Sequence, residues 1–163
     1  MMKKYLQLFL MSAVGGMSAF ATEAERGFMH LPSFPSKILH LDDPEGYPDD
    51  CRRKANEAYE ILQIMEEPDE DTLRKGVMLL IETAQAGDSC SLEKLANMAL
   101  FGQHSIPKDV GWAVDALIYL TDKGEGGAWN FLNAIDINAV KLLEVGKREE
   151  ARQLFIKTWS ERE

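Results

Sequence analysis

Apolar side chains recur at helical spacing along the chain that follows Cys51. Between residues 52 and 66 they fall on one broad face, at Ala55, Ala58, Tyr59, Ile61, Leu62 and Met65. Steps of three and four residues place such side chains on the same side of an α-helix. No stretch shows the strict alternation of apolar and polar positions that is typical of a half-buried strand. The pattern predicts an all-α body.

Glycine and proline residues divide this body into six predicted helices. The predicted helices cover residues 52–66, 72–86, 91–100, from Pro107 and Asp109 to Lys123, from near Gly127 onward, and 148–160. Gly87, Gly102 and Gly124 each follow a predicted helix. Glycine is common there because it adopts the left-handed conformation that ends many helices.

The helical segments also repeat. A shift of 37 residues pairs Gly87 with Gly124, Val77 with Val114, Leu80 with Leu117 and Ile81 with Ile118. A further shift of 38 residues pairs Ala113 with Ala151 and Leu117 with Phe155, and Ala58, Leu95 and Leu132 recur at the first interval. Chance agreement between amphipathic helices is the alternative, but the matching glycines argue against it. The pattern predicts about three helix–turn–helix repeats in residues 51–163.

The segment before this body has a different composition. Residues 22–50 contain four of the six prolines and apolar side chains without a clean helical period. Dense proline keeps a chain extended or turning. We expect a proline-rich N-terminal arm whose apolar side chains lie on the helices. Its His40–Asp43 cluster could hold a metal ion, but no ligand spacing supports that interpretation over a solvated loop.

The first 21 residues have the features of a secretory signal peptide. Lys3 and Lys4 precede a short apolar stretch, and Ala19-Phe20-Ala21 resembles a cleavage site. The apolar stretch is too short and too rich in glycine and serine for a membrane anchor, which needs about 20 apolar residues. We therefore expect a soluble protein in the periplasm or outside the cell.

The charge balance narrows the range of partners. The chain has 27 acidic and 18 basic residues and a net charge of −9, which becomes −11 without Lys3 and Lys4. Nucleic acids and anionic membrane surfaces attract basic proteins, so neither is an expected partner.

Cys51 and Cys90 are the only cysteines. In an oxidising compartment two cysteines favour a structural disulfide, since no C-x-x-C motif or nearby histidines suggest a metal or redox site. The alternative is two separate thiols.

The segment from Ser91 to Gly124 resembles the Sel-one-like repeat, a relative of the tetratricopeptide repeat. The matching positions are Leu95, Gly102, Ile106-Pro107-Lys108-Asp109, Ala113 and Gly124. The flanking units are degenerate, and in the third unit Ala139 stands where the loop glycine is expected. The resemblance implies a short α-solenoid of about three repeats that binds other proteins on its concave face, with the first helix of each pair lining the groove.

This resemblance, with Leu95 and its equivalents taken as core positions, gives a set of candidate partner-binding residues. They are Arg53, Asn56, Glu60, Gln63, Glu93, Asn97 and Asn130. Plain solvent exposure is the alternative for each of them. Trp129 could be a binding hot spot, although a role in capping the core is the simpler interpretation.

Catalytic chemistry has little support in the sequence. The three histidines have no recognisable spacing, and nucleophile, phosphate-binding and zinc-protease motifs are absent. The acidic run 66–71 lacks the ligand spacing of a calcium loop. We expect no cofactor, no metal site and no catalytic residue; a cell-envelope hydrolase is a remote alternative.

The sequence thus predicts a protein–protein interaction module with an adaptor or scaffold role. The main alternative is a dedicated inhibitor, such as an immunity protein that neutralises a toxin or enzyme. Negative charge would favour a basic partner in either case, because opposite charge steers association.

Overall fold

The computed structural model describes residues 29–39 and 47–162, which form an all-α body without a β-strand. The predicted signal peptide and the His40–Asp43 cluster lie outside the described residues. The helices are α2 (Asp49–Tyr59), the π-helical turn η2 (Glu60–Ile64), α3 (Glu70–Gln85), α4 (Ser89–Phe101), α5 (Val110–Asp122), α6 (Gly126–Ile135), α7 (Ile137–Glu144) and α8 (Arg148–Ser160).

Aspartate side chains begin four of these helices. Asp69, Asp88, Asp109 and Asp136 each accept a hydrogen bond from a backbone N–H in the first turn of α3, α4, α5 and α7, respectively. The first N–H groups of a helix have no partner within it, so such N-cap residues stabilise the helix, typically by about 1 kcal/mol. Sequence therefore sets where these helices start.

The observed helices follow the predicted ones except between α6 and α8. The sequence analysis expects one helix from near Gly127, with a loop at Ala139, whereas the structure has α7 there. Asp136 is the physical reason. Its extended backbone (φ −158°, ψ 108°) ends α6, and its side chain accepts hydrogen bonds from the N–H groups of Asn138 and Ala139 at 2.8 and 3.2 Å, which starts α7.

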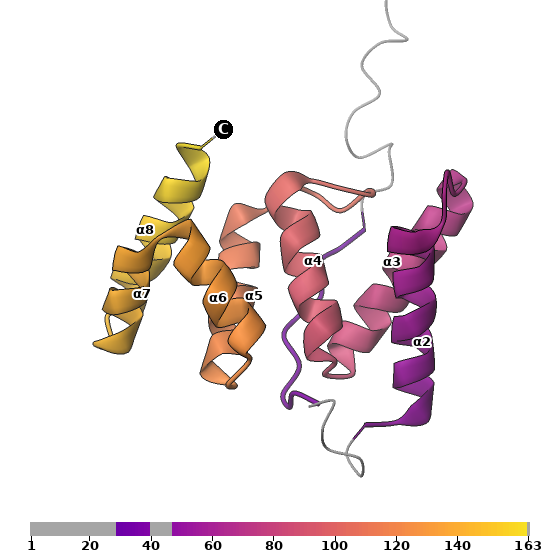
Figure 1. The fold of residues 1–163 in the computed structure, drawn as a ribbon, viewed down its shortest axis with the longest axis horizontal. Helices are drawn as coiled ribbons and strands as arrows, with labels where there is room; N and C mark the ends of the chain where they lie inside the picture. The colour runs from indigo at the N-terminus through magenta and orange to yellow at the C-terminus, as the bar shows by residue number, and fades with distance from the viewer. Residues whose placement is uncertain (1–28, 40–46, 163) are drawn as a thin grey trace, which may run out of the picture.

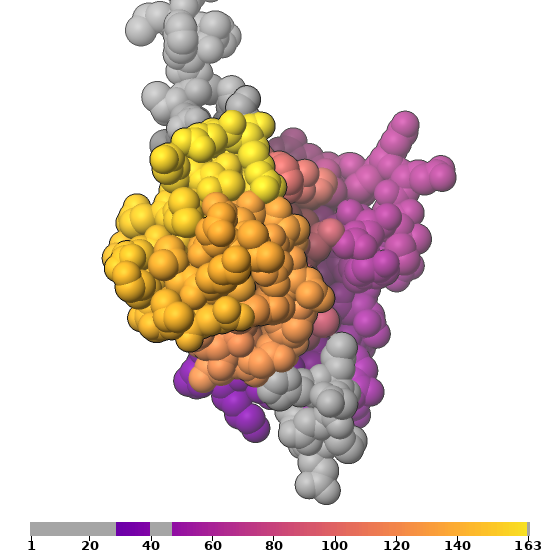
Figure 2. Space-filling view, turned by 60° about the vertical axis from the view of Figure 1, so that its left-hand side comes forward, coloured from indigo at the N-terminus to yellow at the C-terminus, as the bar shows by residue number. Residues whose placement is uncertain are grey.

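The helices lie in a row (Figure 1), with α2 and α3 at one end, α4 and α5 in the middle and α6 to α8 at the other end. Each helix packs on the next one in sequence, and α8 also packs on α5. Fully buried side chains, including Leu92, Leu117 and Phe155, join the helices into one core. Seen from the C-terminal end, α6 to α8 form a continuous mass in front of α2 and α3 (Figure 2).

Two ion pairs between described residues link α5 and α8. The Arg152 guanidinium donates two hydrogen bonds to Asp115, at 2.6 and 2.9 Å, and Arg148 pairs with Asp122. Because the Arg152 bond is paired and partly buried, it fixes how α8 lies along α5.

The arm packs against the helices through an aromatic contact. Phe34 stacks on Tyr119, with ring centroids 5.3 Å apart, and lies 5.8 Å from the ring of Trp112. The Trp112 indole N–H donates to the Pro32 carbonyl at 3.1 Å, and the Tyr119 hydroxyl donates to the Pro35 carbonyl. The arm thus lies along α5, and the predicted packing of its apolar side chains is confirmed for residues 29–39.

The arm also reaches the turn between α3 and α4. Leu39 donates a backbone hydrogen bond to the Gly87 carbonyl at 2.8 Å. Gly87 has φ +108°, and a Cβ atom there would lie 2.4 Å from the Lys37 carbonyl oxygen. Only glycine permits both this backbone conformation and this close approach.

Replacing Phe34 with alanine should therefore destabilise the whole domain. We expect a loss of about 2 kcal/mol, since the half-buried ring has two aromatic neighbours. Chemical denaturation measures this loss, and Ser33→Ala, an exposed change in the same arm, should stay within about 0.5 kcal/mol of the wild type. Equal stability of the two variants would show that the arm does not contribute to the fold.

A candidate partner-binding groove between α2 and α4

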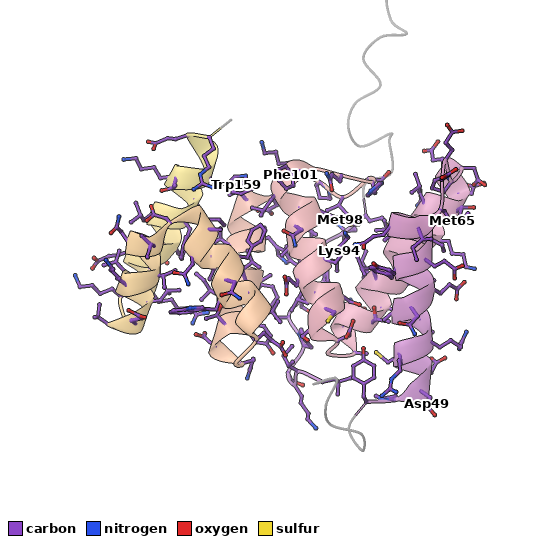
Figure 3. The ribbon with its side chains drawn as sticks, viewed as in Figure 1. Asp49, Met65, Lys94, Met98, Phe101 and Trp159 are labelled. Carbon is purple, nitrogen blue, oxygen red and sulfur yellow. The ribbon has the colours of Figure 1, made fainter. Side chains whose placement is uncertain are left out.

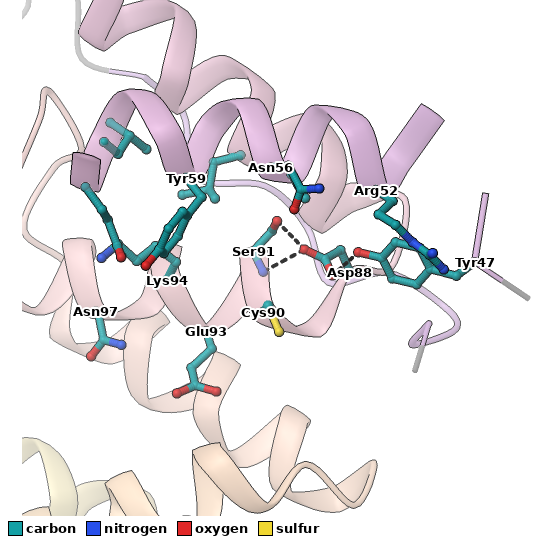
Figure 4. A pocket seen from close by; sticks show the side chains of 14 residues that line it. Tyr47, Arg52, Asn56, Tyr59, Asp88, Cys90, Ser91, Glu93, Lys94 and Asn97 are labelled. Atoms are coloured by element: carbon teal, nitrogen blue, oxygen red, sulfur yellow. Dashed lines mark hydrogen bonds between the residues drawn. The ribbon is translucent and has the colours of Figure 1, made fainter. Parts of the chain in front are cut away.

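Helices α2 and α4 run in the same direction, with an open groove of about 460 Å³ between them (Figure 4). We call it the α2–α4 groove. It is lined by Tyr47, Arg52, Ala55, Asn56, Tyr59, Leu62, Gln63, Leu80, Asp88, Cys90, Ser91, Glu93, Lys94 and Asn97. The groove exists because α3 packs on both helices and holds them apart.

Four of the seven residues predicted from the sequence line this groove: Asn56, Gln63, Glu93 and Asn97. The other three lie outside it: Arg53 is ion-paired with Asp50, and Glu60 and Asn130 are exposed. The prediction took the side of α2 opposite the core, whereas the groove lies on the side facing α4. The positions of α2 and η2 that line it are therefore 52, 55, 56, 59, 62 and 63.

The floor of the groove is a buried hydrogen-bond network around Asp88, whose side chain is 1% exposed. Its carboxylate accepts from the Tyr47 hydroxyl at 2.5 Å, from the Ser91 backbone N–H at 2.9 Å and from the Ser91 hydroxyl. The Thr83 hydroxyl is 2.7 Å from that of Ser91. A buried carboxylate is tolerated when donors surround it in this way.

Tyr47 remains a hydrogen-bond donor in this network. Burial, followed by the bond to Asp88, raises the pKa of its hydroxyl far above the usual range. The sequence analysis did not identify Tyr47, because its role depends on a contact with a residue 41 positions away. Its position before a helical segment gives no signal of that contact.

Glu93 lies on the far side of α4 from Tyr47. Figure 4 shows it pointing away from α2, and its carboxylate lies against Gly127 of α6, where a Cβ atom would be 2.7 Å from Oε2. Burial, followed by the nearby charge of Glu125, raises the pKa of Glu93. The Glu93 carboxylate therefore lies nearer to α6 than to α2.

Both cysteines are free thiols in the structure, which therefore gives no support to the expected disulfide. Cys51 is buried in the first turn of α2 beside Tyr47 and Leu39, whereas Cys90 is exposed at the start of α4 and lines the groove. Both thiols lie near the Tyr47 hydroxyl, whose pKa they help to raise.

Aromatic side chains meet near the C-terminal ends of α4 and α8. Phe101, at the end of α4, is 54% exposed and contacts the Trp159 ring edge-on, with centroids 5.2 Å apart (Figure 3). Trp129 is half-buried and packs on the core. Its position agrees with the capping role that the sequence analysis favours over a hot spot.

Comparison of the chain with known protein families, with curated proteins and with solved structures finds no match. Within residues 29–39 and 47–162, no group of three or more His, Cys, Asp or Glu side chains is arranged to hold a metal ion. No helix in these ranges has the length and apolar character that crossing a membrane requires. We therefore base the proposed function on the α2–α4 groove.

The thiols give a direct test of the structure at the groove. We expect one thiol, Cys90, to react with iodoacetamide in the native protein, and two to react after unfolding without a reductant. Burial and the charge of Asp88 raise the pKa of Cys90, so less thiolate is present at a given pH. Alkylation should be slower than for a free cysteine at pH 8 and should accelerate above the ordinary thiol pKa of about 8.5. Mass spectrometry that finds no free thiol after unfolding would restore the disulfide.

Proposed function

We propose that this protein is an exported interaction module that binds an extended segment of a protein partner in the α2–α4 groove. In this proposal the helices form a short solenoid of about three Sel-one-like repeats with an adaptor or scaffold role. The observation that carries it is the groove itself, an open trough of about 460 Å³ between two parallel helices.

Amide side chains in the largely apolar lining of the groove suit a peptide backbone. Asn56, Gln63 and Asn97 carry amide groups that both donate and accept hydrogen bonds. None of the three side chains is hydrogen-bonded to another described residue. They are therefore available to the N–H and C=O groups of an extended segment.

Exposed apolar side chains accompany these amides. Tyr59, on the groove wall, is 54% exposed, and Ile64, one turn further along the chain, is 62% exposed. Large exposed apolar residues together with a few hydrogen-bonding groups are typical of protein-binding surfaces. They would contact apolar side chains of the bound segment.

The arm favours this face over the opposite one. On the side of α5, Phe34 and the backbone of residues 32–39 already occupy the surface of the helices. A tethered segment competes at an effective concentration in the millimolar range, so an outside peptide is disfavoured there. The α2–α4 groove is not covered by residues 29–39.

The repeat proposal has its own support. Helix α5 packs on α8, the helix that the 38-residue shift makes equivalent to it, and the ion pair between Asp115 and Arg152 lies in this contact. Equivalent helices of stacked repeats lie side by side in this manner. The third unit departs from the simple pattern because α7 is inserted between α6 and α8.

Filling the groove should abolish partner binding. We expect the double variant Asn56→Arg and Asn97→Arg to lose at least about tenfold in affinity, because two long side chains would occupy the space of the bound segment. The measurement is capture of partners from a periplasmic extract of the source cells, followed by titration of the captured protein. Asn130→Arg, on the exposed surface of α6, is the matched control.

Two outcomes would contradict this prediction. If the filled variant retains the same partner at the same affinity while its helical circular dichroism is unchanged, the binding surface is elsewhere. If Asn130→Arg alone removes the partner, the binding surface lies on α6.

A further inference from the structure

We infer that the segment bound in the α2–α4 groove is acidic, with carboxylate side chains that pair with Lys94 on α4 and Arg52 on α2. This inference rests on the proposed function and adds the chemistry of the occupant. It comes from the charges in the groove, which differ from those of the rest of the molecule.

Lys94 is a half-buried cation without an acidic partner. Figure 4 shows it beneath Tyr59, on the groove side of α4. No ion pair joins it to another described residue. Seven other described cations are paired with acids, namely Arg53, Lys54, Lys75, Lys147, Arg148, Arg152 and Lys157, and the unpaired Lys37, Arg74, Lys123 and Lys141 are exposed. The ammonium group of Lys94 is therefore available to a carboxylate of a bound segment.

Arg52 is the second cation, held at the other end of the groove. Its guanidinium lies 5.3 Å from the centroid of the Tyr47 ring, and Tyr47 is fixed by its bond to Asp88. No described acceptor takes a hydrogen bond from this guanidinium. A planar guanidinium can donate two parallel hydrogen bonds to a carboxylate, so its orientation on the ring prepares it for an acid.

The acids of the groove do not neutralise these two cations. Asp88 is buried and already accepts hydrogen bonds from Tyr47 and Ser91. Glu93 points away from α2 and packs against Gly127. The charged groups of the groove that remain free to pair with a bound segment's carboxylates are therefore Arg52 and Lys94, although the chain as a whole has a net charge of −9.

The net charge alone favours a basic partner, as the sequence analysis expects. Exposed charges are screened beyond about 8 Å at physiological ionic strength. A segment inside the groove is closer than that to Lys94 and Arg52, and farther from most of the acids on the outer surface. Local charge therefore decides which side chains fit in the groove, whereas net charge affects the rate of approach.

Three peptides test this inference on the full-length protein. They share one Ser, Thr and Val scaffold of nine residues, have an acetylated N-terminus and an amidated C-terminus, and carry two Glu, two Gln or two Lys residues. Binding is followed by the backbone amide signals of ¹⁵N-labelled protein, which detect millimolar affinities. We expect the Glu peptide to shift the signals of Asn56, Lys94 and Asn97 and to bind about fivefold more tightly than the Gln peptide.

The variants identify the source of that preference. The double variant Arg52→Gln and Lys94→Gln should lower the affinity for the Glu peptide about fivefold and bring it to that of the Gln peptide. Lys141→Gln removes an exposed lysine of α7 and should leave both affinities unchanged.

The outcomes separate the two proposals. If the Gln or Lys peptide shifts the groove signals with equal or higher affinity, the segment is not acidic and the groove proposal stands. If the Glu preference survives in the double variant, other groups cause it and this inference is wrong. If no peptide shifts the groove signals at any concentration up to the millimolar range, the proposed function itself is overturned.

Discussion

The junction between α3 and α4 is the constraint on which the rest of the structure depends. Gly87 accepts the backbone N–H of Leu39, and Asp88, the next residue, accepts the Tyr47 hydroxyl while it caps α4. Leu39 and Tyr47, which both precede α2, are thus fixed to consecutive residues of one turn. A carboxylate that is 1% exposed needs these donors, because an unpaired buried charge would cost several kcal/mol.

Because of this junction, the two sides of the helix row differ in how much of their surface the N-terminal segment covers. From Leu39 backward the chain lies along α5, where Phe34, Trp112 and Tyr119 pack together. From Tyr47 forward it enters α2, which is held apart from α4 by α3. One side is therefore covered by the protein's own chain and the other carries the open groove. The same interaction that stabilises the fold also keeps residues 29–39 on the side of α5, away from the groove that we propose as the binding surface.

The sequence predicts most of the helices because their signals are local. Aspartates at positions 69, 88 and 109 and a glycine at 102 mark helix ends within a few residues. Helix α7 is missed because Asp136 breaks and restarts the helix without glycine or proline. The groove is predicted in part. Helical phase identifies Asn56 and Asn97, but Tyr47 and Asp88 meet across 41 residues, and no local pattern records such a contact.

The charges of the molecule are likewise predictable only in part: the sequence gives the net charge, but the charges in the groove depend on the fold. A net charge of −9 follows from composition and determines the electrostatic attraction or repulsion that acts on a distant partner. The charge of the groove follows from which way individual side chains point: Glu93 faces α6, Asp88 is saturated by its donors, and Lys94 faces Tyr59. Adjacent residues 93 and 94, of opposite charge, both border the groove but point in different directions from α4. One helical step of about 100° separates them. Composition therefore cannot determine which charges face a bound segment, whereas the packing of α4 on α3 and α5 does.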